Sequence, residues 1–130
     1  MRGIDGRALG TWSLRLDAIY CVLLGTAVVL SAGPLAELVR IPGVLISTAG
    51  LVIVLWAGVV IWLLAKLRIR TALRMVMGVN VLAALLVALC AVAAATLLAV
   101  VGVLAVAVDV AAFAVSQALA LRTLPGPQGA

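Results

Sequence analysis

Histidine is absent from this chain of 130 residues, and cysteine occurs only twice, at Cys21 and Cys90. The commonest protein ligand of haem iron and zinc is therefore missing, and the two cysteines are too far apart in sequence for a CxxC redox pair. Glycine-rich phosphate loops, paired carboxylates at glycosidase spacing and serine nucleophile motifs are missing as well. The sequence predicts no catalytic residue set, no metal site and no cofactor, and nothing in it favours an enzyme.

Charge is also scarce, since only 10% of the residues are charged while 68% are hydrophobic. The mean hydropathy of +1.43 lies far outside the range of soluble domains and indicates an integral membrane protein. The net charge of +5 could suggest nucleic acid as a partner. The basic residues cluster at the ends of apolar runs, however, which membrane topology explains better. The expected partner is the lipid bilayer, and no nucleic acid is expected.

The apolar residues form runs that are long enough to cross a bilayer, which takes about 20 residues in a helix. Gly33-Pro34 ends the first run, because proline favours a break there. A turn at 94–96 divides the apolar stretch 81–108, which is too long for one crossing. The predicted spans are 14–32, 43–65, 71–94 and 97–121. Residues 1–13 and 123–130 are predicted to be flexible tails, and 14–122 to be one all-α, membrane-spanning four-helix bundle.

Lysine and arginine orient the bundle, because short cytoplasmic loops of membrane proteins carry the excess of positive charge. Apart from Arg40, which Glu37 balances in the first connector, the basic residues lie before or at the start of the first span, between the second span and the start of the third, and after the fourth. Both termini are therefore expected in the cytoplasm, with an up-down-up-down topology. A cleaved signal peptide over residues 1–33 is the competing interpretation, which would leave three spans. Lys66, Arg68 and Arg70 could also contact anionic lipid, although such clusters often only set the topology.

Asp109 is the single formal charge between Arg74 and Arg122, near the middle of the fourth span. A carboxylate at the bilayer centre costs at least about 2.5 kcal/mol, so this residue is a candidate functional group. Helical spacing places it on one face with small and polar residues, while the opposite side can meet lipid or a neighbour. The members of this face are Gly102, Ala105, Asp109, Ala112, Ser116 and Ala120. Asp109 is either a proton or cation site, or a hydrogen-bonded residue that fixes helix packing.

Asn80 is the expected partner of Asp109. At about 1.5 Å per residue, Asn80 lies about 13 Å and Asp109 about 18 Å from the cytoplasmic ends of their spans, so a contact is feasible. Ser116 and Gln117 complete this candidate intramembrane polar site. Nearer the cytoplasm, Asp17 and Arg74 form a candidate ion pair between the first and third spans. The alternative is that both side chains reach outward to the headgroups.

Several short motifs carry a resemblance: LRLDAIYCVLLGTAVVL, GPLAEL and IPGVL, then MGVN in the third span and QALALR in the fourth. Over residues 14–122 the chain resembles uncharacterised four-helix integral membrane proteins of bacteria, especially actinobacteria. The resemblance draws attention to Asp17, Asn80 and Gln117 and supplies no activity. Many relatives have tryptophan soon after the asparagine, where this chain has Val81-Leu82-Ala83. The expected location is the bacterial cytoplasmic (inner) membrane, as a multi-pass protein.

Two functions follow from these residues. The first is association through helix packing, either as a homo-oligomer or as an accessory subunit of a membrane complex. The second is a small proton- or cation-coupled transporter or channel that uses Asp109. They differ in whether Asp109 titrates in a watered cavity.

Overall fold

The computed structural model describes residues 5–125, which form helices and contain no strand. The elements are α1 (Gly6–Leu30), α2 (Ala32–Val39), α3 (Gly43–Lys66), α4 (Ile69–Cys90), the 3-10 turn η1 (Ala91–Ala93) and α5 (Leu97–Thr123). Helices α1, α3 and α5, and α4 together with η1, are long and apolar enough to cross a membrane. The predicted all-α four-helix bundle is confirmed, and the chain is a small multi-pass membrane protein.

The first helix begins earlier than predicted. Asp5 caps it, because its Oδ1 accepts hydrogen bonds from the backbone N–H groups of Arg7 at 3.0 Å and Ala8 at 3.2 Å. The predicted tail 1–13 is therefore helical from Gly6, while 1–4 and 126–130 lie outside the described residues. Asp17 is consequently about 16 Å along α1 from its first residue, at about 1.5 Å per residue, instead of near its end.

The connectors between the helices begin and end at residues that favour helix starts and stops. Pro34 lies in the first turn of α2, where its missing N–H is tolerated, and Arg40 ends α2 in a left-handed conformation with φ 55°. Thr96 caps α5 by accepting from Ala99 N at 3.1 Å, so the predicted turn at 94–96 is confirmed. The backbone N–H of Ala95 donates to Leu38 O at 2.6 Å. This bond joins the two connectors at one end of the bundle.

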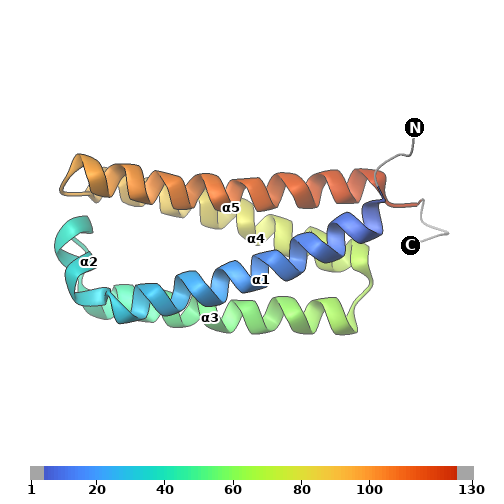
Figure 1. Cartoon of the computed structure of the whole chain (residues 1–130), viewed down its shortest axis with the longest axis horizontal. Coiled ribbons are helices and arrows are strands. Elements are labelled where there is room, and N and C mark those ends of the chain that lie inside the picture. Colours follow the sequence, from blue (N-terminus) through green and yellow to red (C-terminus); the bar gives the residue numbers. More distant parts are fainter. Residues whose placement is uncertain (1–4, 126–130) are drawn as a thin grey trace.

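The bundle consists of two helical hairpins (Figure 1). Helix α1 packs mainly against α3, and α4 packs mainly against α5. The principal contact between the hairpins is α1 with α5, and α1 runs obliquely so that it approaches α5 toward the start of α1. There, a Cβ on Gly6 would lie 2.6 Å from Thr123, and one on Gly10 would lie 2.8 Å from Leu73. The hairpins are therefore joined most closely at this end.

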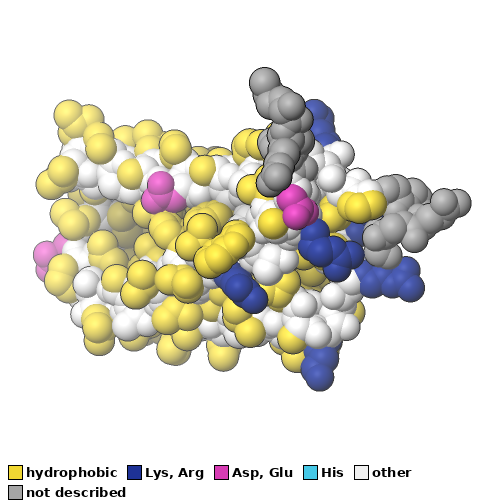
Figure 2. Space-filling view, turned by 45° about the vertical axis from the view of Figure 1, so that its right-hand side comes forward, with side chains coloured by type: hydrophobic (Ala, Val, Ile, Leu, Met, Phe, Trp, Pro, Cys, Tyr) yellow, Lys and Arg dark blue, Asp and Glu magenta, His cyan; other side chains and the backbone are white. Residues whose placement is uncertain are grey.

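The buried core lies toward the same end. Leu14, Val60, Leu73 and Val76 are each 0% exposed and belong to one cluster that draws on α1, α3, α4 and α5. Most other large apolar side chains are exposed, as expected where the surroundings are lipid. Figure 2 shows hydrophobic side chains along the flank and most of the visible basic side chains toward one end. The exposed apolar surface is thus the lipid-facing surface of the molecule.

Helices α1 and α3 cross in backbone contact at two glycines. A Cβ on Gly25 would lie 2.6 Å from Gly50 O, and a Cβ on Gly50 would lie 2.8 Å from Gly25 O. Small residues permit this close approach, which favours helix association within a membrane. The first hairpin therefore depends on glycine at both positions.

Gly25→Ala is expected to lower the free energy of unfolding by about 1–3 kcal/mol, because the methyl group forces the helices apart. The measurement is unfolding in mixed micelles, followed by circular dichroism. Gly58→Ala in α3 is the matched control, since a Cβ there meets nothing within 4 Å. Equal destabilisation by the two substitutions would contradict the proposed role of the crossing.

Candidate functional site

Three polar side chains from three helices meet inside the bundle. Asp17 of α1 is 1% exposed, Asn80 of α4 is 3% exposed and Gln117 of α5 is 0% exposed. Asn80 Nδ2 donates to Asp17 Oδ2 at 2.6 Å and to Gln117 Oε1 at 3.1 Å. Gln117 Nε2 donates to Asp17 Oδ2 at 2.9 Å, and Cys21 Sγ lies 3.5 Å from Asp17 Oδ1. We call Asp17, Asn80 and Gln117 the buried polar network.

The sequence positions these side chains through helical spacing. Each lies on the inner stripe of its helix, three or four residues from other buried positions. The buried residues at this spacing are Leu14 and Cys21 on α1, Val76 on α4, and Ala114 and Ala120 on α5. The three residues to which the family resemblance draws attention therefore come together in space.

The predicted ion pair between Asp17 and Arg74 is not formed. Arg74 is exposed, whereas Asp17 is buried and accepts hydrogen bonds from two amides. Arg74 precedes Asn80 by six residues, which at about 100° per residue places the two side chains about 120° apart around the helix axis. It therefore lies on a different face of α4, and the prediction from depth alone was wrong.

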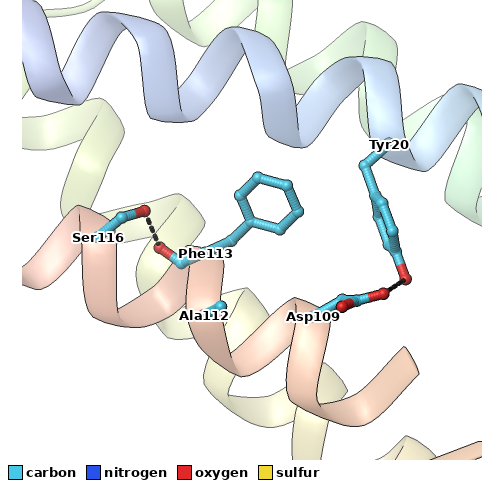
Figure 3. A pocket seen from close by; sticks show the side chains of 5 residues that line it. All are labelled: Tyr20, Asp109, Ala112, Phe113 and Ser116. Atoms are coloured by element: carbon cyan, nitrogen blue, oxygen red, sulfur yellow. Dashed lines mark hydrogen bonds between the residues drawn. The ribbon is translucent and has the colours of Figure 1, made fainter. Parts of the chain in front are cut away.

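A second polar group lies between α1 and α5 (Figure 3). The hydroxyl of Tyr20 donates to Asp109 Oδ2 at 3.0 Å, and the Tyr20 ring lies 5.4 Å from the Phe113 ring, tilted by 57°. Ser116 Oγ donates to Phe113 O at 2.8 Å and lies 2.6 Å from Ser13 Oγ. Asp109 is thus bonded to a neutral hydroxyl across the interface between the two hairpins.

These side chains line a hollow of about 380 Å³, whose wall is formed by Tyr20, Asp109, Ala112, Phe113 and Ser116. Asp109 is exposed, so the hollow opens on the flank of the bundle. Asp109 lies about 18 Å along α5 from Leu97 and about 21 Å from Thr123. The opening is therefore at the middle of the span and not at either end.

The predicted site of Asp109, Asn80, Ser116 and Gln117 is divided between these two places. Ser116 follows Asp109 by seven residues and shares its face, whereas Gln117 is turned about 100° from Ser116. Asn80 and Gln117 belong to the buried polar network, and Asp109 and Ser116 line the hollow. The predicted contact between Asn80 and Asp109 was therefore wrong. Asp109 is bonded instead to Tyr20, a partner that was not predicted from the sequence.

The small-residue face of the fourth span was expected to pack against other helices, but much of it is exposed. Gly102, Ala105 and Ala112 are exposed, and a Cβ on Gly102 would meet nothing within 4 Å. The inward face of α5 is formed instead by Ala107, Ala114, Gln117 and Ala120. The part of the stripe from Gly102 to Ala112 is therefore exposed, whereas Ser116 and Ala120 at its other end face the bundle.

The basic residues after α3 lie at the end where the hairpins join. Lys66 and Arg68 are exposed, so both can reach lipid headgroups. Arg70 is partly buried, and its Nη2 donates to Pro125 O at 2.6 Å. Arg70 therefore connects the start of α4 with the residues that follow α5, a structural role that its charge alone did not indicate.

No family model, curated protein or solved structure matches this chain. Among residues 5–125, no three His, Cys, Asp or Glu side chains are grouped to hold a metal ion. The buried polar network and the hollow at Asp109 are therefore the features that bear on function.

Asn80→Ala is expected to lower the free energy of unfolding by about 0.6–2 kcal/mol, because Asp17 and Gln117 each lose a partner. Thr48→Ala is the control, since the Thr48 hydroxyl bonds only within its own helix, to Val44 O at 2.8 Å. The free energy of unfolding of both variants is measured in mixed micelles. In a double-mutant cycle, Asn80→Ala and Gln117→Ala should be non-additive; strict additivity would contradict a shared network.

Proposed function

We propose that this membrane protein binds a proton or a small cation at Asp109 and moves it through the membrane, as a compact transporter or channel. The observation that carries the proposal is the position of Asp109, exposed in a hollow at the middle of α5 and bonded to the neutral hydroxyl of Tyr20. An ionisable group at this depth is typical of ion and proton pathways.

Electrostatics supports this function. Among residues 5–125, Asp109 forms no ion pair, and the basic residue on its own helix, Arg122, is about 20 Å away along the axis. An ionised carboxylate costs at least about 2.5 kcal/mol at the bilayer centre. A bound proton or cation would offset this cost. A group in this position can exchange one for the other.

The hairpin architecture supports movement around the site. The hairpins are held together most closely at the end of the buried polar network, while at the opposite end Ala95 N–H and Leu38 O connect them by one backbone bond. The hollow lies between α1 and α5, which belong to different hairpins. Displacement of one hairpin against the other would change access to Asp109.

Asp109→Asn is expected to reduce proton flux to the level of protein-free liposomes, because an amide cannot exchange a proton at this site. The measurement uses proteoliposomes with a pH-sensitive dye inside, and the carboxyl infrared band is recorded across pH. Glu37→Gln is the matched control, since Glu37 is an exposed acid of α2 outside the long apolar helices. Unchanged flux in Asp109→Asn, or a carboxyl group that never titrates, would contradict the proposal.

Association remains a second candidate function, and a separate observation favours it. The stripe of Gly102, Ala105 and Ala112 faces outward beside Asp109. Membrane helices associate through small residues, and polar side chains reinforce such contacts. A second copy of this chain, or another membrane protein to which it is an accessory subunit, could cover this stripe.

Single-cysteine crosslinking tests this second function in a Cys21→Ala, Cys90→Ala background. Ala105→Cys should form disulfide-linked dimers in liposomes, because Ala105 is exposed on the stripe. Ala107→Cys is the matched control at nearly the same depth, since Ala107 is only 7% exposed. Similar crosslinking at both positions, or its loss on dilution into more lipid, would indicate random collision.

We also propose the orientation of the protein in a bacterial cytoplasmic membrane. The end that carries Lys66, Arg68 and Arg122 faces the cytoplasm, in agreement with the positive-inside rule. Lys66 and Arg68 then lie where anionic headgroups can be contacted, at about 1 kcal/mol for each basic residue. Membership of the actinobacterial family that the sequence resembles is consistent with this placement.

A further inference from the structure

The hollow at Asp109 combines a carboxylate with two aromatic rings (Figure 3). Tyr20 and Phe113 line it from α1 and α5, with ring centroids 5.4 Å apart and planes tilted by 57°. A positively charged nitrogen is attracted to a carboxylate and to the faces of aromatic rings. The side chains around Asp109 therefore favour an ammonium group more than a neutral or anionic one.

The size and position of the hollow restrict the ligand further. A volume of about 380 Å³ suits a small organic molecule, near the lower end of the usual range of ligand pockets. The opening lies on the flank of the bundle at the middle of α5, where the surroundings are hydrocarbon. A ligand that enters here must be soluble in the hydrocarbon layer, apart from its charged group.

The available oxygen atoms argue for an organic cation over an inorganic one. Hard metal cations such as calcium take about six or more oxygen ligands. Around the hollow the side-chain oxygens belong to Asp109, Tyr20 and Ser116, and the Ser116 hydroxyl already bonds Phe113 O and Ser13. Too few oxygens remain for a metal ion, whereas an alkylated ammonium needs none of them as ligands.

We infer that the cation bound in this hollow is a lipophilic organic ammonium, which enters from the bilayer between α1 and α5. The inference rests on the proposed function and names the class of its ligand. Tyr20 bonds Oδ2 of Asp109, and we assign contact with the ammonium group to the other oxygen, Oδ1. Phe113 supplies a ring face, and the bound cation favours the ionised form of Asp109.

The probe is benzyltrimethylammonium, and its neutral isostere is neopentylbenzene, in which carbon replaces the charged nitrogen. Binding is measured by calorimetry on the full chain in phosphatidylcholine nanodiscs, and the carboxyl infrared band is recorded with and without the probe. The cation should bind at least about tenfold more tightly than the isostere. Its binding should lower the intensity of the protonated carboxyl band of Asp109.

Three variants identify the site. Asp109→Asn should weaken binding of the cation by about tenfold or more, because the opposite charge is lost. Phe113→Leu should weaken it about threefold while keeping an apolar wall. Glu37→Gln should leave binding unchanged. If Asp109→Asn does not fold, the comparison of the two probes and the Phe113→Leu variant still test the inference on folded protein.

The outcomes separate this inference from the proposed function. If Asp109 titrates and carries protons while the two probes bind equally or not at all, the assignment of an organic ammonium as the ligand is wrong and the proposed function stands. If Asp109 neither titrates nor supports flux and the cation does not bind, both are wrong. Unchanged cation binding in folded Asp109→Asn would place the probe elsewhere and overturn the inference.

Discussion

The hydrogen bonds of Asp17 with Asn80 and Gln117 are the interaction on which the arrangement of this bundle depends. In a bilayer, lipid tails are as apolar as leucine side chains, so apolar contact alone gives helices little reason to choose one another. Asp17 belongs to the first hairpin, whereas its two amide partners belong to the second. Separation of the hairpins would deprive Asp17 of both amide donors in hydrocarbon, while Asn80 and Gln117 would keep only their bond to each other. The network therefore selects both the contact and its register.

The position of this network also explains the hollow. Because the hairpins are joined where α1 begins and α5 ends, α1 diverges from α5 farther along, where Tyr20 bonds Asp109 at the hollow. The two aspartates consequently have different surroundings. Asp17 is enclosed by three donors, including a thiol, while Asp109 has one neutral donor and an open side. The first suits a fixed packing role, and the second suits a group that exchanges its partner.

The sequence predicted the number of spans and most of the connectors, because apolar length and proline position determine both. It did not predict the rotation of the helices. When every face of a helix is apolar, hydrophobic periodicity carries little information, and the depth of Asn80 and Asp109 was an insufficient guide to contact. Rotation decides that Asn80 faces Asp17 and that Arg74 turns away. The Asp5 cap was missed as well, and with it the true depth of Asp17.

The long sequence separation within the buried polar network has a consequence for biosynthesis. Asn80 and Gln117 follow Asp17 by 63 and 100 residues, so all of the first hairpin is synthesised before either amide. The contact between Gly25 and Gly50 lies wholly within that hairpin and can form first. Until α4 and α5 are inserted, Asp17 lacks both of its amide partners. The order of synthesis therefore allows α1 and α3 to pair before the first hairpin is fixed against the second.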